Sequence, residues 1–165
     1  MPKDNQDELF VVVDKNDKIL GYKTRYECHH NKELIHRATG VVLFNDKGEI
    51  LLQKRSMTKD TNPGLYTLSA SGHVGKGESY EEAAERELFE EIGVKKKIQF
   101  VKKFLMNMKT ETEMESIYID QYNGPFTLDR TETDQIEFFT PKRIKQILPL
   151  LTPFAVESLR RMQII

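Results

Sequence analysis

Three glutamates in the middle of the chain have the spacing of a carboxylate cluster. Glu87, Glu90 and Glu91 are three and four positions apart, so on an α-helix they share one face. Like charges at this distance repel and raise one another's pKa unless a cation lies between them. Carboxylate oxygens suit Mg²⁺ or Mn²⁺, hard ions that keep several waters and bridge to phosphate groups. The spacing therefore predicts a divalent metal site beside a phosphorylated ligand.

An acidic helix is more often a solvated surface, and the neighbouring residues decide between the two interpretations. Ala83 and Ala84 project on the same side as Glu87. Leu88 and Ile92 take a different side, so a division into one wet and one apolar face does not describe this helix. The small residues predict that the glutamate side lies close against another part of the chain.

Both ends of this helix are marked in the sequence. Ser79 and Glu82 form a capping box, which predicts a helix over residues 79–92 whose first helical residue is Tyr80. Gly93 stands where a left-handed C-terminal cap is expected. The preceding loop contains three glycines, which let the backbone approach a metal or a phosphate closely: Gly72, Gly75 and Gly77.

The elements that must position this helix follow from apolar runs separated by turn residues. The predicted strands cover residues 9–13, 19–22, 39–44, 50–53, 98–106, 116–122 and 137–139. Further helices are predicted over 141–147 and 152–162, each with a proline in its first turn. Strands mixed with separated helices predict an α/β (α+β) fold in which helices cover the faces of a sheet.

Composition limits the classes of protein that fit. A chain of 165 residues has room for one core, so we expect a single domain over residues 1–165. The 25 basic and 26 acidic residues leave a net charge of −1, which argues against nucleic acid as a partner. The oligomeric state stays open, and a homodimer is among the possibilities.

The same sequence carries signals about location. Apolar runs such as residues 10–13 are far below the ~20 residues that span a bilayer, and the polar N-terminus is unlike a signal peptide. Cys28 is the only cysteine, so the chain cannot form an internal disulfide and a reducing compartment fits best. We therefore expect a cytoplasmic protein without a membrane partner.

The acidic helix and its glycine loop resemble the Nudix box, G-x5-E-x7-R-E-U-x-E-E-x-G-U, in which U is aliphatic. The resemblance covers residues 72–94 and includes every fixed position: Gly72, Glu78, Arg86, Glu87, Leu88, Glu90, Glu91, Gly93 and Val94. The family fold is an α/β/α sandwich around a mixed β-sheet, and it accommodates the strands and helices predicted above. A chance match at so many positions is improbable, so we interpret the chain as a Nudix domain.

This resemblance implies a Mg²⁺- or Mn²⁺-dependent hydrolase. Glu87, Glu90 and Glu91, with the carbonyl of Gly72, would bind the ion, and an activated water would attack phosphorus. Glu90 or Glu87 would accept the proton of that water, and Arg86 would orient the carboxylates. The implied substrate is a small molecule with a diphosphate linkage, such as a nucleoside diphosphate derivative or a related phosphorylated metabolite.

Other segments resemble the type I isopentenyl-diphosphate isomerases, an offshoot of the Nudix fold. The resemblance rests on residues 54–59, 62–66 and 71–73. It implies a second metal position, structural or regulatory here, made by three histidines and two glutamates that share one strand face: His29, His36, His73, Glu113 and Glu115. It also implies contacts to the substrate phosphates from three basic residues: Arg55, Lys59 and Arg25.

Two departures from those isomerases favour hydrolysis. Ser71 stands where they have a cysteine that transfers protons to and from carbon, and a hydroxyl is far less acidic than a thiol. Cys28 lies elsewhere and is read as a small buried apolar residue. The isomerases also interrupt the box at its arginine–glutamate pair, which is intact here as Arg86 and Glu87. An isomerase-like enzyme and a non-catalytic diphosphate-binding module stay as the alternatives.

Overall fold

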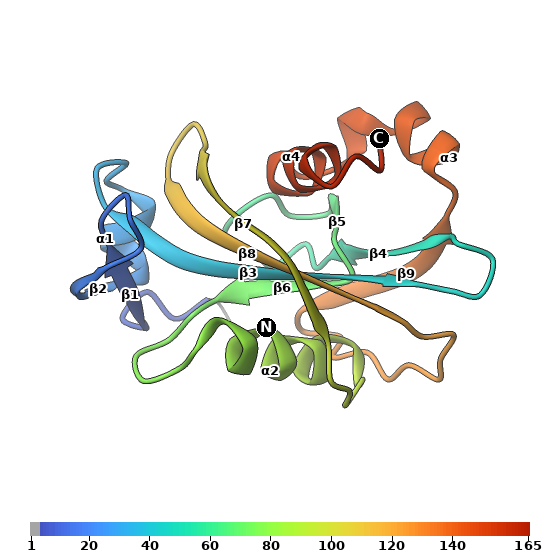
Figure 1. Cartoon of the computed structure of the whole chain (residues 1–165), viewed down its shortest axis with the longest axis horizontal. Coiled ribbons are helices and arrows are strands. Elements are labelled where there is room, and N and C mark those ends of the chain that lie inside the picture. Colours follow the sequence, from blue (N-terminus) through green and yellow to red (C-terminus); the bar gives the residue numbers. More distant parts are fainter. Residues whose placement is uncertain (1–3) are drawn as a thin grey trace.

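The computed structural model describes residues 4–165, in which a mixed β-sheet carries helices on two faces (Figure 1). The helix α2 (Tyr80–Ile92) lies on one face, and α3 (Pro141–Gln146) and α4 (Pro153–Arg161) lie on the other. The short helix α1 (Arg25–His29) and a 3-10 turn (Leu148–Leu150) complete the helical elements of these residues. The predicted α/β/α sandwich around a mixed sheet is confirmed.

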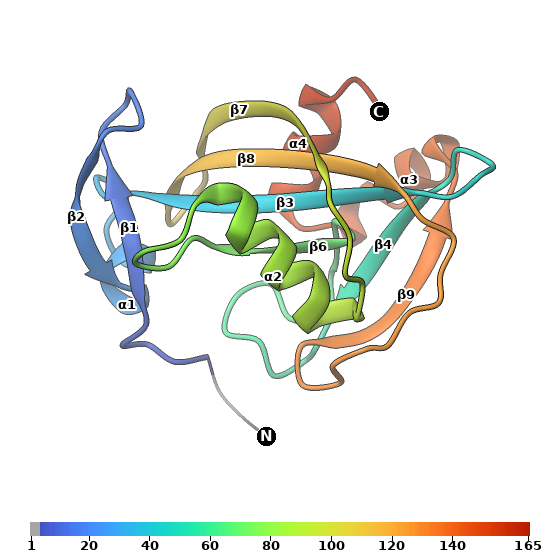
Figure 2. The ribbon, with the colours of Figure 1, turned by 60° about the horizontal axis from the view of Figure 1, so that its bottom comes forward.

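Within the described residues, nine strands form the sheet: β1 (Leu9–Val13), β2 (Ile19–Thr24), β3 (Ile35–Phe44), β4 (Ile50–Arg55), β5 (Tyr66–Thr67), β6 (Ala70–His73), β7 (Gln99–Asn107), β8 (Thr112–Gln121) and β9 (Thr133–Phe139). The central strand β3 pairs in parallel with β8 over its whole length and antiparallel with β1 and β6. Strand β4 pairs antiparallel with β9 and β5. Figure 2 shows α2 crossing over β3 and β6, the two strands that it contacts most.

The core lies on both faces of the sheet because the inner strands alternate their side chains between two layers. On β3, Val41 packs into the cluster of Leu88 and Ile92 from α2. The next residue, Val42, packs into the cluster that contains Leu159 of α4. The same strand therefore holds both helices. Each fully buried side chain of this size contributes about 1.5–3 kcal/mol of transfer free energy.

The ends of α2 agree with the sequence prediction. The Ser79 hydroxyl accepts a hydrogen bond from the amide of Glu82 at 3.1 Å, and the Glu82 carboxylate accepts from the Ser79 amide at 3.4 Å. Gly93 adopts the left-handed conformation with φ of 72°. Ala83 and Ala84 are completely buried, which confirms that this side of the helix lies close against the rest of the chain.

The predicted starts of two inner strands were wrong by several residues. Strand β3 begins at Ile35 rather than at residue 39, and β8 begins at Thr112 rather than at residue 116. Both omitted segments contain polar residues, and His36, Glu113 and Glu115 interrupt the apolar pattern from which strands are predicted. These three side chains are nevertheless buried, and the parallel pairing places His36 directly opposite Glu113.

Shorter elements were missed altogether. Strand β6 is rich in small and polar residues and has little strand propensity of its own, and β5 has only two residues, too few to show a pattern. Helix α1 was also missed, although Thr24 and Glu27 form a capping box that would have marked its start. Strand β9 was predicted from residue 137 but begins at Thr133. Within residues 4–165, no helix has the length and apolar character needed to cross a bilayer.

Gly93→Ala tests how tightly the end of α2 is packed. A Cβ at this position would lie 2.8 Å from Cβ of Thr127 and 2.9 Å from its carbonyl oxygen, in addition to requiring a positive φ. The matched control is Gly48→Ala, where φ is also positive, at 75°, but a Cβ meets nothing within 4 Å. Both substitutions carry the left-handed backbone cost of about 1–2 kcal/mol. We expect Gly93→Ala to lose a further ~1–3 kcal/mol in urea unfolding. Equal losses for the two variants would contradict this packing.

Candidate active site

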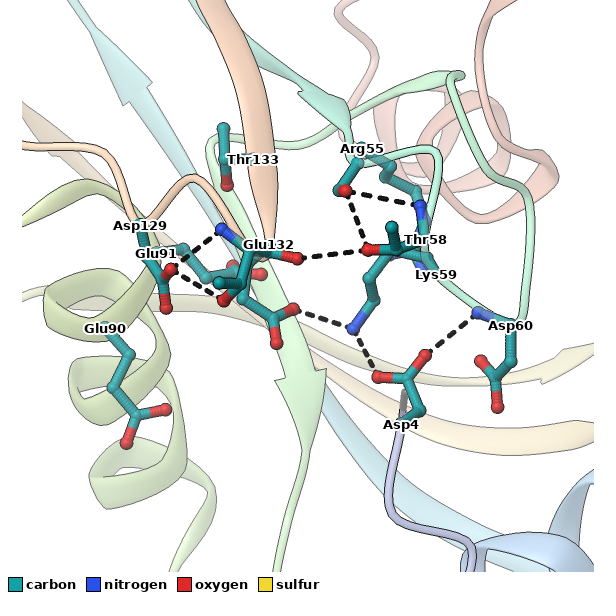
Figure 3. A network of polar contacts seen from close by, with 12 residues as sticks. Asp4, Arg55, Thr58, Lys59, Asp60, Glu90, Glu91, Asp129, Glu132 and Thr133 are labelled. Atoms are coloured by element: carbon teal, nitrogen blue, oxygen red, sulfur yellow. Dashed lines mark hydrogen bonds and ion pairs between the residues drawn. The ribbon is translucent and has the colours of Figure 1, made fainter. Parts of the chain in front are cut away.

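One cleft of about 280 Å³ collects most of the residues that the sequence singled out. The predicted residues among its lining are Arg25, Arg55, Lys59, Gly72, His73, Arg86, Glu87, Glu90, Glu91, Glu113 and Glu115. The other two predicted residues, His29 and His36, adjoin the cleft through contacts with His73. Figure 3 shows one end of this arrangement, with Glu90 and Glu91 on α2 across from Arg55 and Lys59.

Arg86 ties the glycine loop to the helix. Its guanidinium donates to both carboxylate oxygens of Glu78, at 2.6 and 2.9 Å, and to Glu87 at 2.7 Å. Weaker hydrogen bonds reach Glu90 at 3.3 Å and the backbone carbonyl of His73 at 3.2 Å. Burial alone would raise the pKa of Glu78, but the hydrogen bonds from Arg86 and from the Gly75 amide, with the charge of Arg86, together outweigh it and the pKa is lowered. The arginine therefore fixes where its neighbouring carboxylates lie.

Glu87 fits only because Gly72 has no side chain. A Cβ on Gly72 would lie 2.3 Å from the carboxyl carbon of Glu87, inside any allowed contact distance. Burial raises the pKa of Glu87 to about 7, with a further contribution from the charge of Glu90, although Arg86 opposes the shift. Gly72 on β6 and Glu87 on α2 are thus matched in shape, and the Glu87 carboxylate lacks enough positive charge around it.

Glu91 is held by partners that the sequence analysis did not find. One of its carboxylate oxygens accepts hydrogen bonds from the Ser71 amide at 2.9 Å and from the side chain of Gln53 at 3.0 Å. Gln53 in turn accepts from the hydroxyl of Thr133, so β4, β6 and β9 all support the glutamate. Burial raises the pKa of Glu91 well above its ordinary value, and the charge of Glu87 adds to the shift. The polar Gln53 inside the apolar run of β4 was the available signal.

The three predicted histidines meet, although they come from α1, β3 and β6. Ring nitrogens of His29, His36 and His73 lie within 4.8 Å of one another. Burial lowers the pKa of His36 to about 3 and holds the pKa of His73 well below its ordinary value. Phe10 stacks on the ring of His73 with centroids 4.1 Å apart. The imidazoles of His36 and His73 are therefore neutral near pH 7, which is the form that binds metals.

Glutamates at the start of β8 and just before it lie beside the histidines, but the two that lie closest to His36 are not the predicted pair. Possible ligand atoms of His36, Glu111 and Glu113 lie within 4.8 Å of one another, and Glu111 was not predicted. Glu115, which was predicted, lines the same cleft outside this group. Glu111 precedes β8 at the same alternation as the other two, so the spacing of every second residue was its signal.

Some of these groups are buried without partners. Among the described residues 4–165, both ring nitrogens of His36 and both carboxyl oxygens of Glu115 lack a hydrogen-bond partner. An unsatisfied buried polar group costs about 1–3 kcal/mol, so native structures rarely keep several of them together without a ligand. The arrangement suits a bound cation near these side chains.

The three basic residues predicted to contact phosphate are all engaged within the chain. Arg25 donates two hydrogen bonds to Asp60, at 2.8 and 3.0 Å. Lys59 lies between Asp4 and Glu132 (Figure 3), at 2.6 and 2.7 Å. The Arg55 side chain donates to the carbonyl and hydroxyl oxygens of Thr61. All three line the cleft, so the structure brings basic groups and the box glutamates to opposite sides of one cavity.

Comparison with known proteins agrees with this fold. The sequence model described as NUDIX domain matches residues 34–162, and the chain belongs to the Nudix family. A crystal structure of a protein from Deinococcus radiodurans superposes with a TM-score of 0.79 at 23% identity, covering 93% of this chain and 98% of that one. This likeness extends the shared fold to nearly the whole chain.

Two curated relatives have different named activities. The chain is 32% identical to "Isopentenyl-diphosphate Delta-isomerase 2" of Photorhabdus laumondii, over 86% of this chain and 82% of the relative. It is 30% identical to an uncharacterised Nudix hydrolase of Pseudomonas aeruginosa, over 95% of this chain and 92% of the relative. The chain is therefore a Nudix protein that resembles the isomerases, and its relatives include both a named isomerase and a named hydrolase.

Glu115→Gln tests the charge balance of the cleft in protein freed of metal with EDTA. Burial raises the pKa of Glu115 from 4.5 to about 8. The folded protein thus binds a proton that the unfolded chain releases between these values, and its stability falls as pH rises through this window. Glutamine mimics the protonated form, so the free energy of unfolding of the variant relative to wild type should rise by ~1.4 kcal/mol per pH unit across the window. Unfolding in urea at pH 5, 6.5 and 8 measures this, and a difference independent of pH would contradict it.

Proposed function

We propose that this protein is a Mg²⁺-dependent Nudix hydrolase that cleaves a diphosphate linkage in a small phosphorylated metabolite, such as a nucleoside diphosphate derivative. The observation that carries the proposal is the shared cleft: Glu87, Glu90 and Glu91 line it on one side, and Arg55 and Lys59 on the other. Carboxylates suit a divalent ion, and cationic side chains suit phosphate oxygens. A diphosphate is the ligand that needs both.

The box carboxylates fit a hard divalent ion. Glu87 and Glu91 both have raised pKa values, because burial and neighbouring carboxylates disfavour their charged forms: Glu90 acts on Glu87, and Glu87 acts on Glu91. Their donor atoms are oxygens, which Mg²⁺ and Mn²⁺ prefer. A bound ion would supply neutralisation of the diphosphate charge and a more acidic water.

The chain's own residues supply the remaining requirements of hydrolysis. Glu90 is about half exposed at the cleft and close to Arg86, so it is free to accept a proton from a water there. Glu87 is the second candidate for this role, since its pKa of about 7 suits a general base near neutral pH. Arg86 acts as a positioning residue that holds both carboxylates in place.

Neutral substitutions separate metal binding from proton transfer. Phosphate release is measured on nucleoside diphosphate sugars, dinucleotides, nucleoside triphosphates and isopentenyl diphosphate, with Mg²⁺ or with EDTA. Glu87→Gln and Glu90→Gln should each lower kcat by roughly 10²-fold or more. The general base is the residue whose loss persists at saturating Mg²⁺, whereas a loss that Mg²⁺ restores marks a metal ligand.

The matched control for these variants is Glu81→Gln, which removes the same charge from an exposed position in the first turn of α2. Its kcat should equal that of wild type. Turnover that survives in EDTA, or that survives in both Glu87→Gln and Glu90→Gln, would refute the hydrolase proposal.

The histidine cluster favours a second candidate function, that of an isopentenyl-diphosphate isomerase with altered chemistry. The supporting observation is the convergence of His29, His36 and His73 with Glu111 and Glu113, together with the isomerase relative from Photorhabdus laumondii. Imidazole ligands suit Zn²⁺ and similar transition ions better than Mg²⁺. The serine that precedes the Gly72–His73 pair disfavours isomerisation. We therefore place hydrolysis first and keep the cluster as a second metal position.

Zinc content tests that second position without reference to activity. His36→Ala and His73→Ala should each lose about one zinc per chain when the proteins are loaded with Zn²⁺, desalted and analysed for metal. His30→Ala is the control, because His30 is exposed and stacks on Tyr26 outside the cluster. Equal zinc in all four proteins would dispose of the site. Formation of an isomer of isopentenyl diphosphate without phosphate release would reverse the ranking of the two functions.

A further inference from the structure

The carboxylate of Asp4 occupies the basic side of the cleft (Figure 3). One of its oxygens accepts a hydrogen bond from the ammonium of Lys59 at 2.6 Å, and the other accepts from the backbone amide of Asp60 at 2.9 Å. The guanidinium of Arg25 lies 3.6 Å from the second oxygen. Only 11% of the Asp4 side chain is exposed, so the anion is held inside the site rather than on its rim.

These donors are the ones that a phosphate group requires. An ammonium, a guanidinium and a backbone N–H around one anion provide two charges and three hydrogen-bonding groups, all directed at oxygen atoms. Arg25 and Lys59 are also two of the three residues expected to contact the substrate phosphates. The chain therefore supplies its own carboxylate at the place where the proposed substrate needs its phosphate.

The contacts around Asp4 show that it can leave without dismantling the site. Lys59 keeps its ion pair with Glu132 at 2.7 Å, and Arg25 keeps its two hydrogen bonds with Asp60. Lys59 and Arg25 each keep a partner when the carboxylate departs, so the large penalty for an unpaired buried charge does not arise. Asp4 is the exchangeable ligand of the group, and Glu132 and Asp60 are its permanent members.

The residues that follow Asp4 hold it nearby. The side chain of Gln6 donates to Asp60 at 2.9 Å, and the backbone carbonyl of Gln6 accepts from the amide of Tyr26 at 3.1 Å. The carbonyl of Glu8 accepts from the amide of Arg25 at 2.8 Å. A carboxylate tethered two residues from an anchored position has a high effective concentration at its site, so it competes strongly with a free anion.

We propose that Asp4 is an internal competitor for the phosphate subsite, which fills the subsite in the free protein and is displaced by the phosphate of the substrate. This inference rests on the phosphate subsite of the proposed function and adds its regulation. The affinity of any phosphate ligand is then reduced by the fraction of molecules in which Asp4 is bound. The class of ligand that displaces it is a diphosphate, whose higher charge outweighs one carboxylate at the same donors.

Binding of inorganic diphosphate tests the proposal directly. Titration calorimetry in EDTA compares wild type with Asp4→Asn, which keeps the shape of the side chain and removes its charge. We expect Asp4→Asn to bind diphosphate roughly three- to tenfold more tightly, as loss of a competing, partly buried ion pair predicts. Asp7→Asn is the matched control, since Asp7 is exposed and the substitution makes the same change in net charge. Its affinity should equal that of wild type.

A second measurement confirms that the effect is competition. If hydrolysis is observed, Asp4→Asn should lower KM by the same factor and leave kcat unchanged, because the competitor acts before chemistry. Equal or weaker diphosphate binding by Asp4→Asn, in protein whose thermal midpoint matches wild type, would overturn the proposal, as would equal tightening by Asp7→Asn. If Asp4→Asn alone binds diphosphate more tightly but the protein hydrolyses no substrate, the Asp4 proposal holds and the hydrolase proposal is wrong. The two proposals can therefore fail separately.

Discussion

The guanidinium of Arg86 is the interaction on which the geometry of the cleft depends. It joins the loop at Glu78, the helix at Glu87 and Glu90, and strand β6 at the carbonyl of His73. The imidazole of that same histidine belongs to the histidine cluster. One side chain thus sets the distance between the acidic helix and the strand that connects the two candidate metal positions.

Around this arginine the cleft contains more negative charge than the chain compensates. Burial raises the pKa values of Glu91, Glu113 and Glu115, and their neighbours are mostly other carboxylates. A core built only for stability would have apolar residues at such positions. Sequences that depart from the ordinary rules of burial do so mainly at functional sites, and here these three glutamates all line one cavity.

Features set by interactions between residues close in sequence were predicted correctly, and features set by distant residues were not. The ends of α2 and the shared face of its glutamates were predicted because capping boxes and helical spacing act within four residues. The starts of β3 and β8 were wrong because His36, Glu113 and Glu115 are polar residues that a cavity buries, and polarity is read as a strand end. The role of Asp4 was invisible, since its partner Lys59 lies 55 residues away and nothing local links them.

The parallel pairing of β3 with β8 also determines at which stage of folding the site forms. Residues opposite each other in this pair are 77 positions apart, and such non-local parallel pairing forms slowly because a long loop must close first. His36 and Glu113 therefore stay apart in any chain that has folded only its local hairpins and helix. An ion that needs both of them binds the native state alone. A higher concentration of that ion would therefore raise the free energy of unfolding.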